Sequence, residues 1–179
     1  VGEPQILGQV KEAVGIARAA NTVGGLLGRI LERTFGVAKA VRTETGISRE
    51  VVSIGSVAVD LACRIFDDLA ACRVLIIGAG KMAETTARSL TGAGVTRVYV
   101  ANRSYDRAAS LAAHHGWRAR SLDELEDLLG EVDVVISSTG ATRPLITSAL
   151  VRRAVRVRKY RPLFVVDIAV PRDVEEAVG

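Results

Sequence analysis

The sequence predicts an α/β fold in which a parallel sheet carries helices on both faces, preceded by a helical segment. Small and β-branched aliphatic residues dominate the 179-residue chain, which is 49% hydrophobic but only 4% aromatic. This usage is typical of sheets that are covered on both sides. From residue 73 onward, strand-length apolar runs alternate with helix-length segments, as in parallel βαβ units. A glycine-rich turn at residues 78–83 joins the first such run to a helix.

Two helices are expected before this alternating part. Residues 4–20 place apolar side chains at helical spacing behind Pro4, and a second helix is expected from about Val23 to Val41, after a turn that contains Asn21. The polar stretch 42–47 fits a domain boundary. We therefore divide the chain into residues 1–45, a helical piece of a preceding domain, and residues 46–179, a nucleotide-binding domain. Because the chain starts at Val1 without a methionine, we expect it to be an excised piece of a longer protein.

The second domain is expected to begin with a helix over residues 48–68, with a serine hydroxyl as its N-cap. One face of this helix should lie against the sheet, and its apolar residues are Ile54, Ala58, Leu61, Ile65 and Leu69. After it we expect strands at 73–77, 97–101, 133–137 and 163–168, and helices at 81–90, 106–114, 122–129 and 148–157.

The turn at residues 78–83 has the small residues that a dinucleotide needs. Gly78 permits a tight turn, Gly80 lets a diphosphate approach the backbone, and Ala83 keeps the helix close to the strand. The full loop is Gly78, Ala79, Gly80, Lys81, Met82 and Ala83. Its position between strand and helix predicts a Rossmann-type cofactor site, with a merely structural turn as the alternative.

The second predicted strand ends without the acidic residue that usually binds the ribose hydroxyls of NAD. Asn102, Arg103 and Ser104 stand there instead. Since an arginine can pair with a 2′-phosphate and its neighbours can donate hydrogen bonds, the predicted cofactor is NADPH. The alternative is a solvated turn.

Two more strand ends should face the nicotinamide half of the cofactor, because ligands of open parallel sheets lie at the carboxyl ends of the strands. The residues concerned are Ser137, Ser138, Thr139 and Gly140, and then Ile168 and Ala169. The neighbouring Asp167 could share this role, pair with Arg172, or accept a hydrogen bond from a nearby backbone amide.

No residue of this chain is predicted to be a catalytic nucleophile or a metal ligand. Cys63 and Cys72 lack a metal-ligand spacing and a neighbouring histidine, so both should be inert, buried thiols. His114 and His115 precede a glycine, as expected near a helix end. The basic run 152–161 raises the question of RNA contact, but we favour a solvated helix face balanced by the acidic residues 123–127.

Several segments together resemble the glutamyl-tRNA reductases, in the same order and at about the same spacing. They are GEPQILGQVK (2–11), VRTETGIS (41–48), VLIIGAGKMA (74–83), VANRS (100–104), ISSTG (136–140) and VDIAVPRDV (166–174). The first and last are more specific than the glycine loop, since generic dinucleotide folds have no need of them. One departure from many members of the family is Lys81, where they carry an acidic residue.

The resemblance implies an enzyme that opens tetrapyrrole and haem (porphyrin) biosynthesis by reducing glutamyl-tRNA(Glu) to glutamate-1-semialdehyde with NADPH. A cysteine thiolate of an amino-terminal catalytic domain, upstream of Gly2, would form a thioester that accepts the hydride. The resemblance also implies a homodimer formed through a carboxyl-terminal region, and transfer of the aldehyde to an aminomutase. The piece alone should bind the cofactor without activity, and the expected location is the cytoplasm.

The resemblance further implies that Glu3, Pro4, Gln5 and Gln9 border the glutamyl substrate. Gln5 and Gln9 are four residues apart, so that both amides project from one helix face. The main alternatives are a shikimate-dehydrogenase-like NADP oxidoreductase and a module that only binds a cofactor. The first would need a catalytic lysine and aspartate before the cofactor domain, and residues 1–41 contain no aspartate.

Overall fold

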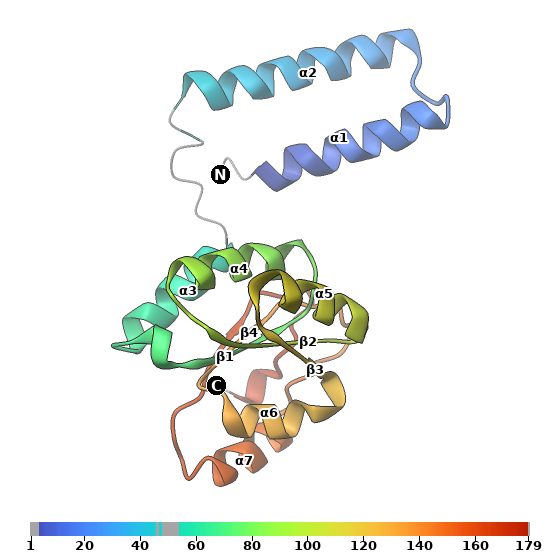
Figure 1. Cartoon of the computed structure of the whole chain (residues 1–179). Helices are drawn as coiled ribbons and strands as arrows, with labels where there is room; N and C mark the ends of the chain where they lie inside the picture. The colour runs from blue at the N-terminus through green and yellow to red at the C-terminus, as the bar shows by residue number, and fades with distance from the viewer. Residues whose placement is uncertain (1–3, 46, 48–53, 179) are drawn as a thin grey trace. The chain divides into compact units, whose positions relative to one another are not determined.

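The computed structural model describes residues 4–45, 47 and 54–178 (Figure 1). The chain divides into two compact units, Val1–Ser53 and Ile54–Gly179. The first unit is a pair of helices, and the second is a parallel sheet with helices on both faces.

The first unit contains helices α1 (Pro4–Ala19) and α2 (Gly25–Glu44). Asn21 turns the chain between them with a φ of 55°, a left-handed conformation that asparagine tolerates better than most residues. The helices touch through an ion pair of 3.4 Å between Arg18 and Glu32 and through the Lys11 ammonium, 5.9 Å from the Phe35 ring centre. The two predicted helices and their turn are therefore confirmed.

This helix pair does not build a core of its own. None of the described side chains of α2 is buried, and large apolar ones are well exposed, for example Ile16 at 67% and Leu26 at 71%. Because helices in proteins gain most of their stability from packing of an apolar face, this unit needs further protein surface to cover it.

The second unit is built on a five-stranded sheet in the order β3-β2-β1-β4-β5, with every pair parallel. The strands are β1 (Arg73–Ile77), β2 (Arg97–Asn102), β3 (Arg118–Ser121), β4 (Val134–Ser137) and β5 (Phe164–Asp167). Residues 74–77 of the central strand β1 are fully buried, as the uninterrupted apolar run predicts for a strand covered on both faces.

Two helical layers enclose the sheet (Figure 1). On one face, α3 (Ile54–Ile65), α4 (Lys81–Gly92) and α5 (Tyr105–His115) pack around Val74 and Ile76. On the other, α6 (Leu125–Glu131) and α7 (Ser148–Val157) pack around Leu75 and Ile77. Three short 3-10 helices complete the unit: η2 (Leu69–Ala71), η3 (Leu122–Glu124) and η4 (Glu176–Val178). The predicted fold class is confirmed.

Strand β3 is absent from the sequence-based prediction. Its residues Arg118, Ala119, Arg120 and Ser121 pair with β2 at the edge of the sheet. The strand contains a single apolar residue, and charged side chains of this kind are typical of edge strands, where they discourage pairing with another chain. A search for apolar runs or strict alternation cannot find such a strand.

The predicted packing face of α3 is wrong in part. Ala58 is buried as expected, but Ile54, Leu61 and Ile65 are 51%, 43% and 55% exposed. The side that packs is made of smaller residues, Gly55, Ala58, Val59 and Ala62. A Cβ atom on Gly55 would lie 2.5 Å from the Thr86 hydroxyl oxygen, so the packing of α3 on α4 demands small side chains rather than the largest apolar ones. The predicted start of this helix lies outside the described residues.

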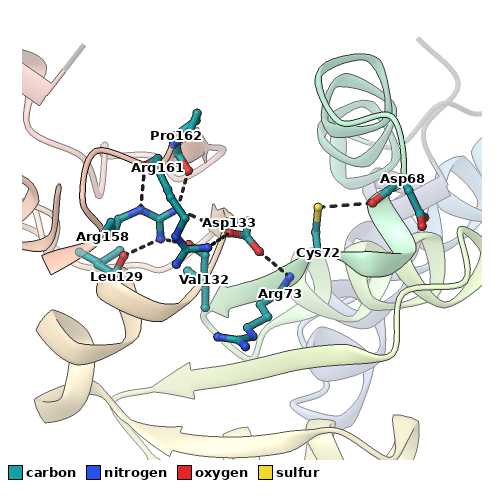
Figure 2. A network of polar contacts seen from close by, with 9 residues as sticks. All are labelled: Asp68, Cys72, Arg73, Leu129, Val132, Asp133, Arg158, Arg161 and Pro162. Carbon is teal, nitrogen blue, oxygen red and sulfur yellow. Dashed lines mark hydrogen bonds and ion pairs between the residues drawn. The ribbon is translucent and has the colours of Figure 1, made fainter.

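A buried arginine closes the amino-terminal edge of the sheet (Figure 2). Arg158, 2% exposed, donates hydrogen bonds to the carbonyls of Leu129 (3.1 Å) and Arg161 (3.1 Å), and to those of Val132 and Pro162. Its guanidinium also lies 3.6 Å from the Asp133 carboxylate, which accepts the Arg73 backbone N–H at 3.0 Å. Burial, followed by the neighbouring Arg161, lowers the pKa of Arg158 from its ordinary value, while Asp133 opposes this shift. An arginine nevertheless stays protonated.

The basic run therefore has two different roles. Arg153, on the exposed side of α7, makes a two-pronged ion pair with Glu126 at 2.8 and 2.9 Å, which confirms the predicted balance by the acidic stretch. Arg158 instead belongs to the interior, contrary to a fully solvated face. Directly after Arg158, the backbone of Lys159 and Tyr160 is left-handed, with φ values of 51° and 61°, so the helix does not continue.

We expect Arg158→Ala to lower the free energy of unfolding by about 3–5 kcal/mol, because it leaves the buried carbonyls of Leu129 and Val132 without their donor. The Asp133 carboxylate keeps its ion pair with Arg161 at 3.1 Å. The matched control is Arg156→Ala, which removes an exposed arginine from the same helix and should change stability by less than about 0.5 kcal/mol. Urea denaturation followed by circular dichroism measures both. Similar losses for the two variants would contradict the structural role of Arg158.

Candidate functional site

The carboxyl ends of β1, β2, β4 and β5, which form one edge of the sheet, are in register with one another. Ile77 at the end of β1 pairs with Ala101 in β2 and with Ser137 in β4, which in turn pairs with Asp167 in β5. The chain continues from β1 toward β2 and β3 on one side, whereas β4 and β5 lie on the other. This edge is therefore a switch point in strand order, the place where open α/β sheets bind their ligands.

Gly78 makes the turn that leaves β1. Its φ is 112°, which L side chains rarely adopt, and its N–H donates to the Ala101 carbonyl at 2.8 Å. A Cβ atom here would lie 2.7 Å from the Ser138 carbonyl oxygen and 3.1 Å from the Ser138 hydroxyl oxygen. The two strand ends thus approach each other so closely that only glycine fits at position 78.

Gly80 lies at the start of α4, where it is the N-cap and has no side-chain cap. A Cβ atom at Gly80 would meet nothing within 4 Å, so the space in front of this helix end is open in the described structure. Ala83, one turn into the helix, is fully buried. Free N–H groups and the positive end of the helix dipole make such a terminus a site for an anion, and the residues present fit a dinucleotide diphosphate.

The end of β2 presents its residues to solvent in a fixed turn. The Asn102 side-chain amide donates to the Ser104 carbonyl at 3.0 Å, which orders the segment rather than pointing the amide at a ligand. Arg103 and Ser104 are exposed. The predicted phosphate-binding role of Arg103 and Ser104 is compatible with this geometry, while the Asn102 side chain already has a partner.

A hollow of about 470 Å³ runs between α4 and α5 beside the glycine loop. Arg107, in the first turn of α5, lines it together with Ala79 of the loop, and the other lining residues are Glu84, Arg88, Ser110, Leu111, His114 and His115. The sequence-based prediction did not include Arg107. The signal that could have identified it is a second arginine four residues after Arg103, at the start of the helix that follows β2.

Two aspartates hold the segment that follows β5, and one of them joins it to the end of β4. Asp173, fully buried, accepts from the Ser137 hydroxyl at 2.7 Å, from the Thr139 N–H at 2.8 Å and from the Thr139 hydroxyl. Asp167 accepts from the N–H groups of Ala169 (3.0 Å) and Val174 (2.9 Å). Of the roles considered for Asp167, the structure thus shows the one of accepting backbone hydrogen bonds.

Asp173 was missed at the sequence level as a member of this site. The segment 166–174 contains Asp173. Nothing in its local pattern indicates that the carboxylate accepts a hydrogen bond from Ser137, 36 positions earlier. Among the predicted cofactor residues of this edge, Ala169 is 9% exposed, Ile168 is partly buried and donates its N–H to the Ser137 carbonyl at 2.9 Å, and Gly140 is exposed.

The predicted substrate residues are described only in part. Glu3 and the side chains of Pro4 and Gln5 lie outside the described residues, and Gln9 is exposed on α1. Pro4, Gln5 and Gln9 do fall within one continuous helix.

The cysteines differ from each other in exposure. Cys72 is buried, its thiol lies 3.5 Å from the Asp68 carbonyl oxygen (Figure 2), and burial, with the charges of Asp133 and Asp68, raises its pKa. A thiol that resists ionisation is a poor nucleophile, in agreement with the prediction for Cys72. Cys63 is exposed, so the expectation that it is buried is wrong.

The histidines have structural partners. His114 contacts the Ser110 carbonyl at 3.3 Å, and His115 contacts the Thr91 hydroxyl at 3.1 Å while its ring stacks on Trp117 at 4.6 Å. Gly116 follows with a φ of 69° and caps α5. No set of three or more metal-ligating side chains occurs among the described residues. None of the helices in the described ranges has the length and apolar content of a membrane span.

These features define a dinucleotide-binding domain of the dehydrogenase type, a class that takes nicotinamide cofactors. Comparison with known families agrees. The model described as "Shikimate / quinate 5-dehydrogenase" matches residues 60–179, and the model described as "Glutamyl-tRNAGlu reductase, N-terminal domain" matches residues 1–45.

The whole chain also matches individual proteins. It is 49% identical to a glutamyl-tRNA reductase of Pseudomonas paraeruginosa and 46% identical to one of Idiomarina loihiensis, each over all 179 residues. The solved glutamyl-tRNA reductase from Methanopyrus kandleri is 47% identical, with a TM-score of 0.67 over 99% of this chain and 45% of that one. The chain belongs to the glutamyl-tRNA reductase family, and its residues 60–179 also belong to the family described as shikimate/quinate 5-dehydrogenase.

The chain spans only part of these relatives, 42% of the length of the Pseudomonas paraeruginosa protein. More distant structures share the fold alone. The nucleotide-binding domain of glutamyl-tRNA reductase from Thermoplasma volcanium, for example, is 21% identical with a TM-score of 0.56, over 70% of this chain and 81% of that one.

We expect Gly80→Val to abolish binding of nicotinamide dinucleotides while lowering the melting temperature only slightly, since valine is a poorer N-cap residue than glycine. The Cβ atom of the added side chain would stand in the open space before α4, with nothing within 4 Å. Titration of NADPH fluorescence and differential scanning fluorimetry measure the two properties. The control is Gly92→Ala at the far end of the same helix, where a Cβ also meets nothing within 4 Å. Unchanged binding by Gly80→Val would show that no diphosphate lies at this helix end.

Proposed function

We propose that this chain is the cofactor-binding part of an enzyme that reduces glutamyl-tRNA(Glu) to glutamate-1-semialdehyde with NADPH, the first step of tetrapyrrole biosynthesis. The observation that carries the proposal is the open, uncapped N-terminus of α4 at Gly80 beside the buried turn at Gly78. It occurs in a chain that resembles glutamyl-tRNA reductases over its whole length. The cofactor supplies a hydride when bound, and the residues of this chain hold and orient it.

NADPH is preferred over NADH in this proposal because of the charges around the end of β2. An acidic residue there would bind the ribose hydroxyls and repel a phosphate, but the strand ends in Asn102, followed by the exposed Arg103. Arg107 lines the hollow beside Ala79, on the same side of the glycine loop. An exposed arginine directly after β2 and a second one in the first turn of α5 favour a 2′-phosphate, to which arginine donates paired hydrogen bonds.

The nicotinamide half would lie on the other side of Gly78. The candidates to line it are the segments Ser137, Ser138, Thr139 and Gly140 after β4 and Ile168 and Ala169 after β5. Ser137 and Thr139 would do so through their backbone, since their hydroxyls donate to Asp173. These residues are small or apolar, so a flat ring can approach the strand ends closely. The register of β1, β4 and β5, which places their ends at one level, supports this arrangement.

Residues 1–45 would form the end of the catalytic domain, and residues 46–179 the NADPH-binding domain. In this proposal Glu3, Pro4, Gln5 and Gln9 border the glutamyl group, and the nucleophilic cysteine belongs to a part of the enzyme outside this sequence. The exposed apolar residues of α1 and α2 support a role as part of a larger domain. Dimer formation, delivery of the aldehyde to an aminomutase and a cytoplasmic location are further parts of the proposal.

The second candidate is an oxidoreductase of the shikimate dehydrogenase type, favoured by the family model that matches residues 60–179. That match covers only the cofactor domain. Residues 1–45 match the amino-terminal domain of glutamyl-tRNA reductases instead, and they contain no aspartate to serve as the acid of a lysine and aspartate pair. The first proposal therefore has the better support.

We expect the chain to bind NADPH more tightly than NADH, and Arg103→Ala to weaken NADPH about 10-fold to 100-fold, as the loss of a charge-assisted hydrogen bond predicts. NADH affinity should not change. Arg107→Ala should act in the same direction. Isothermal titration calorimetry at fixed ionic strength measures each affinity. Arg97→Ala, at the opposite end of β2, is the control for lost positive charge. Equal affinity of the native chain for both cofactors would contradict this assignment.

The reaction itself is tested with the protein extended to the length of its relatives. We expect oxidation of NADPH, followed by the loss of its absorbance, only when glutamyl-tRNA is present, and none when the nucleophilic cysteine of the added domain is changed to serine. Gly80→Val in the extended protein should also abolish the reaction. Oxidation of shikimate, with no response to glutamyl-tRNA, would favour the second candidate.

A further inference from the structure

The hydroxyl of Ser138 is buried and has no hydrogen-bond partner within the described part of the chain. Buried polar side chains nearly always have a partner, so an unpaired one at a ligand-binding edge points to a group that is bound there. The hydroxyl oxygen lies close to the glycine loop, since a Cβ atom built on Gly78 would be 3.1 Å from it. The hydroxyl therefore stands directly beside the first glycine of the loop.

The residues on either side of Ser138 are both held by Asp173. The Ser137 hydroxyl donates to one carboxylate oxygen at 2.7 Å, the Thr139 N–H donates to the same oxygen at 2.8 Å, and the Thr139 hydroxyl donates to the other. Successive side chains of a strand and its extension point to opposite faces. With Ser137 and Thr139 turned toward Asp173, the side chain between them is turned the other way, toward Gly78.

Asp173 is itself rigidly placed. Its carbonyl accepts from the N–H groups of Leu145 (2.7 Å) and Ile146 (2.9 Å), and the next residue, Val174, donates its N–H to Asp167 at 2.9 Å. The carboxylate is fully buried. The segment after β5 is thus fixed against the end of β4, and the position of Ser138 follows from it.

We propose that Asp173 is a positioning residue, which holds Ser137 and Thr139 so that the Ser138 hydroxyl meets the bound cofactor. Its partner is an oxygen of the phosphate and ribose on the nicotinamide side of NADPH, because Ser138 follows β4, across Gly78 from the β2 end that would bind the 2′-phosphate. The inference rests on the proposed binding of NADPH across Gly78 and Gly80.

The first test is Ser138→Ala in the whole chain. We expect the dissociation constant for NADPH to rise about 10-fold, as the loss of one hydrogen bond to a charged ligand predicts. Affinity for adenosine 2′,5′-bisphosphate, which lacks the nicotinamide half, should stay the same. The melting temperature should not fall, since the variant removes a hydroxyl that has no partner in the protein. Calorimetry and scanning fluorimetry measure these properties.

The second test asks whether the tie to Asp173 acts through Ser138. Ser137→Ala should weaken NADPH in the native background but have no further effect in Ser138→Ala, so the two changes are not additive. Asp173→Asn should retain most of the affinity, because the amide can still accept from Ser137 and Thr139 N–H and can donate to the Thr139 hydroxyl. Thr147→Ala, which removes the cap of α7 away from this edge, controls for a simple loss of stability.

The outcomes separate this inference from the function on which it rests. If the native chain binds no NADPH, the proposed function fails for this chain and the inference fails with it. If NADPH binds but Ser138→Ala leaves its affinity unchanged, or weakens the bisphosphate equally, only the assignment of Ser138 is overturned. Additive effects of Ser137→Ala and Ser138→Ala would overturn the positioning role of Asp173.

Discussion

The pairing of β1 with β2 and β4 is the constraint on which the rest of the second unit depends. Because Ile77 pairs with both Ala101 and Ser137, the chain leaves three strands at one height. Gly78 must then turn within the space left by Ser138, and a left-handed glycine is the residue that can do so. That turn aims the first N–H groups of α4 along the edge, where an anion can meet them.

Polar groups have different partners at the amino-terminal and at the carboxyl-terminal ends of the strands. At the amino-terminal edge, Arg158 and Asp133 satisfy buried carbonyls and a backbone N–H with protein partners (Figure 2). At the carboxyl edge, Asp173 satisfies Ser137 and Thr139, yet the Ser138 hydroxyl and the N-terminus of α4 are left without side-chain partners in the described structure. Where the polar groups at the strand ends have protein partners, their hydrogen bonds stabilise the fold. Where they have none, they can bind a ligand.

Much of the fold follows from local patterns. Strand β1, both ends of α7 and the first residue of α4 lie where the sequence predicts them, because apolar runs, caps and glycines act within a few residues. The failures occur where a distant neighbour decides. Strand β3 has its place through pairing with β2, and the packing side of α3 is selected by the close approach of Gly55 to Thr86 rather than by the largest apolar residues.

The sequence by itself determined the class of the fold and the glycine turn, and it predicts the arginine after β2 and the small residues at the other strand ends as further parts of the site. Each has a reason in local chemistry, which a linear pattern records. Only the tertiary structure decided that Asp173 reaches Ser137, that Arg158 lies in the interior and that Arg107 faces the hollow beside Ala79. A charged side chain looks the same in a sequence whether water or a buried partner surrounds it, and that difference arises only when distant segments pack together.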